Sequence, residues 1–425
     1  MTASVLGFAG MTHLGINSAV AAAEKGCNVV CFDPDPARIN QLLRKELPVV
    51  EPELPELLAK NWSRIKFAAH CADLKPCDVV YVAPDVPTDD QGQSDLGPIN
   101  GLIDQVDDML RSDAVMVILS QVPPGFTRRR LRPGRLLYYQ VETLIFGRAM
   151  ERALHPERFI VGCADPEKPL PQAFAQFLER FDCPILSMHY ESAELAKISI
   201  NMCLVASVSV ANTMAELCEK VGADWAEIVP SLKLDKRIGQ HAYLAPGLGI
   251  AGGNLERDLA TVCRLADEKG SDAGVVRAWI ANSQHRRDWA LRTLHVEVLA
   301  KKAEPIIAVL GLAYKQDTAS TKNSPSLALI NHLHPFALRV FDPAVPASVL
   351  NHPRVTGASS ALEACAGADA LVIMTPWKQF AELDPAQIAK KLRGKIVLDP
   401  YAVLKPAPCR AAGLEYLTLG RSALN

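Results

Sequence analysis

The chain has 425 residues, of which 49% are hydrophobic and 22% charged, and its formal net charge is −2. This length and composition predict a globular protein of two or three domains. The balanced charge excludes a global electrostatic field for nucleic acid or an anionic membrane, so we expect neither as a partner. No basic leader precedes the first apolar segment, and no run of about 18 apolar residues occurs, so we expect no export signal and no membrane span.

The eleven cysteines are scattered along the chain without a C-x-x-C pair. The closest two, Cys27 and Cys31, fall in a predicted strand that would hold them about 13 Å apart. We therefore expect no metal site, and we expect reduced thiols in a cytoplasmic protein.

The first part of the chain alternates strands with helices. Residues 4–9 predict a buried strand, followed by a glycine turn and an alanine-rich helix to about Lys25. A proline-rich loop is expected at 163–171. This alternation predicts a parallel sheet with helices on both faces. Its further strands are expected at 27–33, 78–83 and 114–119.

Residues 191–220 predict one long helix without Pro or Gly, apolar around most of its circumference and therefore suited to a subunit or domain interface. More helix should follow to about residue 300, before a second strand–turn–helix unit begins at 305–312. The fold class is thus α/β, with two Rossmann-like parallel-sheet domains joined by a long central helix and a helical middle domain. The remaining strands are expected at 338–342, 370–374 and 395–399, and the domains at 1–188, 189–300 and 301–425.

A G-x-G-x-x-G turn, with threonine in the middle glycine slot, separates the first strand from the first helix. Such a turn lets the backbone approach a pyrophosphate at a helix N-terminus. Asp33 ends the second strand, where it can accept from a ribose 2′-hydroxyl, so we expect NAD rather than NADP. Arg38 could instead attract a 2′-phosphate, and the glycines could simply end a strand. The turn consists of Gly10, Met11, Thr12, His13, Leu14 and Gly15.

Several motifs follow in a fixed order along nearly the whole chain, and together they resemble the UDP-glucose/GDP-mannose 6-dehydrogenase family. The resemblance implies an N-terminal NAD domain, a central helix that forms a homodimer, and a C-terminal domain for the UDP moiety. It also implies oxidation of a sugar 6-hydroxyl to a carboxylate with two NAD, as in polysaccharide biosynthesis. The motifs lie at 51–54, 86–89, 120–125, 155–158, 191–201, 237–239, 247–258, 311–315 and 324–325.

Lys197 and Asn201 are spaced i, i+4 on the predicted long helix, so both side chains can reach one oxygen. Two such donors would stabilise alkoxide character as a hydride leaves carbon. Burial could alternatively lower the pKa of Lys197 enough for it to act as a base. Without a ligand, the same pair could be a lysine at a buried helix face and a satisfied amide.

The resemblance assigns further residues, each of which could otherwise be an ordinary surface or helix-end side chain. Glu142 would assist the water steps, and Asp258 would orient water and Lys197. Arg237 would reach the substrate of a partner subunit, and Lys315 would contact phosphate. Other implied contacts are Val86, Thr88, Ser120, Gln121 and Lys322 for the cofactor, and Leu144, Tyr243, Leu244, Gly249 and Tyr314 for the substrate.

Asn254 stands where the family has its nucleophilic cysteine. A thiolate adds to an aldehyde, whereas an amide nitrogen does not, because its lone pair is delocalised. Cys263 cannot replace it, because nine helical residues span about 13 Å. Other departures are Gln121 for threonine, Phe146 for glutamate, Lys322-Asn323 for Arg-Glu and Tyr401 for arginine.

The sequence therefore predicts an NAD-dependent oxidation of the C6 hydroxyl of a nucleotide sugar, most simply a UDP-hexose, without a covalent thioester. Two alternatives remain open. One is a catalytically silent protein that binds NAD and a nucleotide sugar. The other is an epimerase that uses NAD transiently and returns the hydride.

Overall fold

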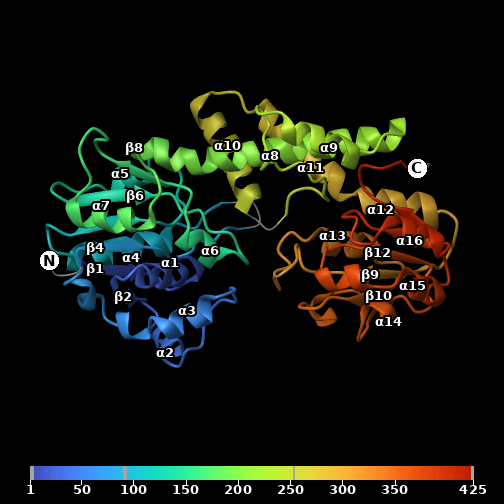
Figure 1. The fold of residues 1–425 in the computed structure, drawn as a ribbon, viewed down its shortest axis with the longest axis horizontal. Helices are drawn as coiled ribbons and strands as arrows, with labels where there is room; N and C mark the ends of the chain where they lie inside the picture. The colour runs from blue at the N-terminus through green and yellow to red at the C-terminus, as the bar shows by residue number, and fades with distance from the viewer. Residues whose placement is uncertain (1–3, 90–92, 252–253, 423–425) are drawn as a thin grey trace. The chain divides into compact units, whose positions relative to one another are not determined.

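The computed structural model describes residues 4–89, 93–251 and 254–422 (Figure 1). The chain separates into two compact units, Met1–Ile200 and Asn201–Asn425. The boundary between them falls inside the long helix α8 (Tyr190–Val221). Each unit contains its own sheet.

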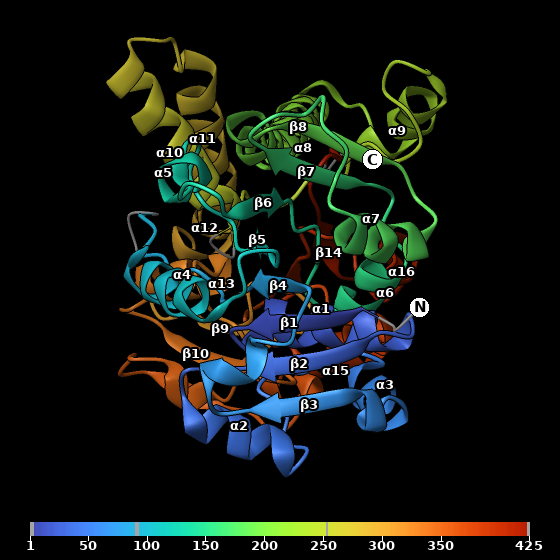
Figure 2. The same cartoon turned by 90° about the vertical axis from the view of Figure 1, so that its left-hand side faces the viewer.

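The sheet of the first unit has the strand order β3-β2-β1-β4-β5-β6-β7-β8, and Figure 2 shows its strands side by side. All neighbouring strands are parallel except β6 and β7, which are antiparallel. The strands are β1 (Val5–Ala9), β2 (Asn28–Phe32), β3 (Ile65–Ala68), β4 (Val79–Val82), β5 (Val115–Ile118), β6 (Leu136–Gln140), β7 (Phe159–Cys163) and β8 (Ile185–His189).

Helices cover both faces of this sheet because alternate side chains of its central strands point to opposite sides. Phe8 and Tyr81 belong to the core under α1, α3, α6 and α7, whereas Val80 and Ile118 belong to the core under α4 and α5. The helices are α1 (His13–Glu24), α2 (Pro36–Leu43), α3 (Leu54–Lys60), α4 (Gly97–Met109), α5 (Phe126–Arg130), α6 (Ala149–Leu154) and α7 (Gln172–Leu178), with 3₁₀ turns η1 (Trp62–Arg64), η2 (Cys71–Leu74) and η3 (Glu179–Phe181).

The second unit begins with helices. After α8 come α9 (Trp225–Leu234), α10 (Asn254–Lys269), α11 (Gly274–Arg287), α12 (Trp289–Leu294) and the π-helical turn η4 (His295–Leu299). The amphipathic α10 packs on α8 and α11 through a small core that includes Val205, Leu259 and Val276. These helices form the expected helical middle of the chain.

The sheet of the second unit has the order β11-β10-β9-β12-β13-β14, and all its strand pairs are parallel. One face packs on α12 and α13 through Val309 and Val372, and the other on α14, α15 and α16 through Ala308 and Leu371. The elements are β9 (Ile306–Leu310), α13 (Pro325–His332), β10 (Ala337–Phe341), η5 (Ala347–Val349), β11 (Val355–Gly357), α14 (Ala361–Ala364), β12 (Ala370–Ile373), η6 (Lys378–Glu382), α15 (Pro385–Lys391), β13 (Ile396–Leu398), α16 (Pro406–Ala411) and β14 (Glu415–Leu417).

The α/β fold class and the expected strands, first helix and long helix are confirmed. Six strands were missed, namely β3, β6, β7, β8, β11 and β14. Several of these are short or partly exposed and lack the continuous apolar run that marks a central strand. The first sheet is also not wholly parallel, because β7 runs antiparallel to β6.

By length and composition alone, α8 could cross a membrane. Several of its ionisable residues, however, are paired with protein groups inside each unit. In the first unit Glu194 accepts from the backbone of Thr127, and in the second unit Glu216 and Glu219 form ion pairs with the buried Arg286. Such pairing is the behaviour of a core helix in a globular protein.

Candidate active site

The turn between β1 and α1 requires glycine at both of its ends. Gly10 has a φ of +94°, and a Cβ there would lie 2.7 Å from the Pro84 nitrogen. A Cβ on Gly15 would lie 1.8 Å from the Gly10 carbonyl oxygen. The backbone therefore folds tightly against the start of α1, as a pyrophosphate-binding turn must.

Asp33 directly follows β2 and lies against this turn. Its buried carboxylate accepts from the Met11 N–H at 2.6 Å, and Arg38 approaches it at 4.0 Å. The carboxylate thus lies where the turn would meet a ribose hydroxyl. Arg38 lies beside this acid rather than beside an empty site for a 2′-phosphate. The residues of this turn fit NAD: amide donors for the pyrophosphate and a carboxylate for the ribose.

His13 belongs to a buried pair that the sequence reasoning did not predict. Its Nε2 lies 2.8 Å from Glu51 Oε1, and the Phe146 ring stacks on the imidazole with centroids 4.1 Å apart. Glu51 also accepts from the Gly147 N–H at 2.9 Å. This pair joins the turn at 10–15, the cofactor turn, to the segment that precedes α6, so the motif at 51–54 has a structural partner.

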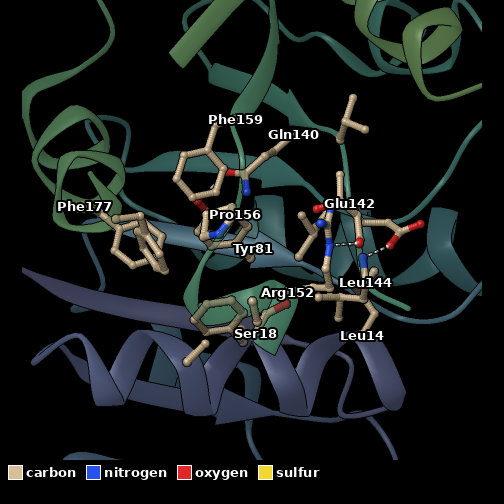
Figure 3. A pocket seen from close by; sticks show the side chains of 17 residues that line it. Leu14, Ser18, Tyr81, Gln140, Glu142, Leu144, Arg152, Pro156, Phe159 and Phe177 are labelled. Atoms are coloured by element: carbon tan, nitrogen blue, oxygen red, sulfur yellow. Dashed lines mark hydrogen bonds between the residues drawn. The ribbon is translucent and has the colours of Figure 1, made fainter. Parts of the chain in front are cut away.

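Lys197 on α8 and Glu142 after β6 form the main ionic contact among the predicted catalytic residues. Lys197 Nζ lies 2.9 Å from Glu142 Oε1, and the two side chains are only 13% and 17% exposed. The other oxygen of Glu142 accepts from the Leu144 N–H at 3.0 Å (Figure 3). The carboxylate is therefore held in place at the end of a strand.

Glu142 and Leu144 also line a largely apolar cavity of about 60 Å³ beside α1 (Figure 3). Tyr81 donates to Gln140 Oε1 at 2.8 Å within it. Leu14 of the cofactor turn is another wall residue. Leu14, a predicted cofactor residue, and Leu144, a predicted substrate residue, therefore line the same cavity as Glu142.

The other predicted cofactor residues of the first unit follow β4 and β5. Ser120 Oγ donates to the Pro84 carbonyl at 2.5 Å, and Thr88 forms an isolated antiparallel bridge with Ser94. Val86 packs against the core under α4, and Gln121 is partly buried. These residues lie at the carboxyl ends of parallel strands, where such sheets bind ligands.

In the second unit, Asn201 and Asp258 form a buried pair. Asn201 Nδ2 donates to Asp258 Oδ2 at 2.5 Å, and Arg257 Nε lies 3.4 Å from the other oxygen. Asn254 is the first residue of α10, one turn before Asp258, and is exposed. Cys263 lies further along the same uninterrupted helix, which supports the expectation that it does not replace Asn254.

The glycine-rich segment before α10 lies against α11 and α8. Gly249 has a φ of +74°, and a Cβ there would lie 2.4 Å from the Ser283 carbonyl oxygen. The Gly247 N–H donates to Asn212 Oδ1 at 2.8 Å. Tyr401, in the place of an expected arginine, comes within 3.7 Å of a Cβ built on Gly247. Gly252 and Gly253 of this motif lie outside the described residues.

Two neighbouring predicted substrate residues differ in accessibility. The Leu244 side chain is buried, and its carbonyl accepts from Trp225 Nε1 at 2.7 Å, whereas Tyr243 is exposed. Arg237 has a side chain that is 88% exposed and pairs with Asp235 at 2.6 Å. Arg237 and Tyr243 are therefore accessible to a ligand or a partner, and Leu244 supports the loop from inside.

The turn after β9 has the same construction as the turn after β1. Gly311 has a φ of +93°, and the Leu312 N–H donates to Asp342 Oδ2 at 2.6 Å, as Met11 does to Asp33. Lys315 Nζ lies 5.7 Å from the centre of the Tyr314 ring. The partly buried Lys322 precedes Asn323, whose amide contacts Glu256.

The structure therefore gathers some of the predicted residues into three groups, whereas Arg237, Tyr243 and Leu244 belong to none of them. The first is the cofactor turn with Glu142 and Lys197, the second is Asn201 with Asp258 and Asn254, and the third is the turn at Gly311. Sequence reasoning missed Glu51 as the partner of His13, Asp85 beside the cofactor turn and the buried Glu194, because these contacts join distant segments. Among the described residues, no group of three or more His, Cys, Asp or Glu could hold a metal ion.

Family models match three consecutive parts of the chain. Residues 3–181 match the NAD binding domain of the UDP-glucose/GDP-mannose dehydrogenase family, residues 191–284 its central domain, and residues 308–406 its UDP binding domain. The cofactor is thus NAD, as the turn at Gly10 predicts.

Full-length relatives agree with these matches. The chain is 30% identical to a UDP-glucose 6-dehydrogenase of Pseudomonas aeruginosa, with 97% of this chain and 96% of that protein covered. It is 28% identical to a UDP-glucose 6-dehydrogenase of Rickettsia typhi, with 97% and 98% covered.

Solved structures show the same fold. A UDP-D-ManNAc dehydrogenase from Pyrococcus horikoshii superposes with a TM-score of 0.84 at 25% identity, covering 99% of this chain and 100% of that one. A UDP-glucose dehydrogenase from Pyrobaculum islandicum gives 0.84 at 26% identity, covering 97% of each. The chain belongs to the UDP-glucose/GDP-mannose dehydrogenase family, and it is an NAD-dependent nucleotide-sugar dehydrogenase.

Proposed function

We propose that this enzyme oxidises the C6 hydroxyl of a nucleotide sugar, most simply a UDP-hexose, to the aldehyde without a covalent thioester. NAD supplies the hydride acceptor when bound. The ion pair of Lys197 with Glu142 is the observation that carries the proposal. The UDP binding domain and the relatives that are named UDP-glucose dehydrogenases support the choice of sugar nucleotide.

Lys197 and Glu142 divide the work in this proposal. The Lys197 ammonium would donate to the C6 oxygen and stabilise the negative charge that develops as the hydride leaves carbon. The Glu142 carboxylate, 2.9 Å away, would receive the hydroxyl proton. The substrate thereby loses a hydride and a proton and becomes an aldehyde. Their low exposure strengthens both interactions, since little water competes.

Asn201 and Asp258 would form the second part of the machinery. Their buried hydrogen bond holds the Asn201 amide, and we propose that its second N–H assists hydride transfer. Asn254, exposed at the start of α10, would occupy the place of the family thiol. Because an amide cannot form the thioester, we propose that the reaction stops before the acid.

The remaining roles are part of the same proposal. Val86, Thr88, Ser120, Gln121 and Lys322 would border the cofactor. Leu144, Arg237, Tyr243, Leu244, Gly249, Tyr314 and Lys315 would border the substrate. We also propose three domains, at 1–188, 189–300 and 301–425, and a cytoplasmic location, which is consistent with eleven free cysteines.

We also propose a homodimer through α8. In the second unit this helix exposes Val210, Met214, Leu217 and Val221, at 55%, 39%, 50% and 66%. Their spacing of i, i+4, i+7 and i+11 places them on one helical face. An exposed apolar stripe of this kind is typical of a protein–protein interface.

The first test is the amount of NADH formed per sugar. With UDP-glucose, UDP-N-acetylhexosamines and GDP-mannose as candidate substrates, we expect a UDP-hexose to yield about one NADH and a C6 aldehyde, identified by product mass. About two NADH and an acid would contradict the proposal. Ligand binding without turnover would instead identify a silent binding protein, and an epimerised sugar without net NADH would identify an epimerase.

Replacing Lys197 with alanine should lower kcat by roughly 100- to 1000-fold, because the developing negative charge loses its cation. NAD affinity, measured by titration, should change little. Lys168→Ala is the control, since that side chain is 78% exposed and forms an ion pair with Asp165 within a surface turn. Equal rates for the Lys197 and Lys168 variants would remove Lys197 from the mechanism.

Replacing Asn254 with cysteine should restore acid formation, with NADH per sugar rising from about one toward two. A trapped thioester should be detectable by mass spectrometry of the protein. Asn254→Ser, which is similar in size to cysteine but lacks the thiol, should keep the aldehyde as product. Acid formation by the serine variant would show that the thiol is not what the pocket lacks.

Leu217→Asp should dissociate the dimer, because an unpaired carboxylate in the interface costs about 3 kcal/mol or more, a hundredfold in Kd. Leu43→Asp is the matched control: Leu43 on α2 is 51% exposed, against 50% for Leu217. Analytical ultracentrifugation distinguishes the two. A wild-type monomer, or equal effects of both substitutions, would contradict a dimer through α8.

A further inference from the structure

Asp85 forms a two-point contact with the cofactor turn. The His13 N–H, at the start of α1, donates to Asp85 Oδ2 at 3.1 Å. In return the Asp85 N–H donates to Thr12 Oγ1 at 2.8 Å. Thr12 is the N-cap residue of α1 but makes no side-chain cap bond of its own. The helix is thus capped by a carboxylate 72 residues away in the chain.

This carboxylate lies at the donor that the cofactor needs. A dinucleotide places its pyrophosphate at the N-terminus of the first helix, on the first free N–H groups of that helix. The His13 N–H is one of these groups, and the structure shows it bonded to an anion. A carboxylate and a pyrophosphate cannot share one donor, since their like charges repel each other at contact distance.

The middle position of the turn adds to this competition. Thr12 stands in the slot where a glycine leaves room for phosphate, and its hydroxyl accepts from the Asp85 backbone. The Asp85 side chain is exposed, so it can rotate into solvent without breaking a packed core. The contact is therefore reversible. Its strength determines the fraction of time for which the pyrophosphate-binding position at the His13 N–H is open.

We infer that Asp85 determines the affinity of this enzyme for NAD, because its carboxylate competes with the cofactor pyrophosphate for the His13 N–H. Binding of the cofactor displaces the carboxylate from the His13 N–H. The apparent Kd exceeds the intrinsic one by the reciprocal of the fraction of time that this position is open. A typical N-cap interaction favours the capped over the uncapped state by roughly two- to thirtyfold. This range sets the expected change in the apparent Kd when the interaction is removed.

The test is the affinity for three probes, measured by calorimetry on the full-length protein. NAD and ADP-ribose both contain the pyrophosphate, whereas adenosine lacks it. Asp85→Ala should tighten the binding of NAD and of ADP-ribose by about tenfold. The affinity for adenosine should stay unchanged. Thermal unfolding without ligand checks that the variant folds.

Asp95→Ala is the matched control. Asp95 is an exposed carboxylate of the same unit that accepts from the Gly97 N–H, at 2.9 Å, at the start of α4. Its removal changes the net charge and a helix cap in the same way, without touching α1. Unchanged or weaker NAD binding by Asp85→Ala, an equal gain in Asp95→Ala, or a gain for NAD but not ADP-ribose would each overturn the inference.

A second variant covers the case in which Asp85→Ala does not fold. Asp85→Asn keeps an oxygen that can cap α1 but removes the charge. We expect about threefold tighter NAD binding at low ionic strength, and a smaller gain at high salt, where the repulsion in the wild type is screened. No gain at low salt would contradict the competition.

Discussion

The buried carboxylate of Glu194 holds α8 against the segment that follows β5 in the first unit. It lies on α8 and accepts from the N–H groups of Gly125 and Thr127, at 2.5 and 2.8 Å, at the start of α5. Burial raises the pKa of this carboxyl, and the two backbone donors oppose that shift. Without them the buried acid would be unpaired, at a cost of about 3–5 kcal/mol.

This contact fixes one turn of α8 to the segment that follows β5. Lys197, three residues after Glu194, is directed toward Glu142 as a result. A second contact acts on the same helix, where Arg128 donates to Glu191 through Nε and Nη2 and lowers the pKa of that carboxyl to about 2. The position of the Lys197 side chain therefore depends on Glu191 and Glu194 of its own helix as well as on Glu142.

Sequence reasoning succeeded where one local pattern determines the structure. The G-x-G-x-x-G turn, the unbroken apolar run of α8 and the strand at 305–312 each carry their signal within a few residues. It failed where a contact joins distant segments. No sequence pattern near His13 indicates that Glu51 is its partner. In the sequence Asp85 resembles an ordinary loop acid, and only the fold places it against α1. The family resemblance supplied Glu142 and Lys197 separately, and only the structure shows them as a pair.

The two nucleotide turns are built alike but charged differently. In each, an acid that follows the second strand accepts from the turn, Asp33 from Met11 and Asp342 from Leu312. Around the first turn lies a further acid, Asp85, whereas Lys315 follows the second. The same turn geometry thus occurs twice, with a charge of opposite sign near each turn. An acid beside the first turn would disfavour a ligand with the greater negative charge there, and a lysine after the second turn would favour it. This difference would keep a sugar nucleotide from occupying the place of the cofactor.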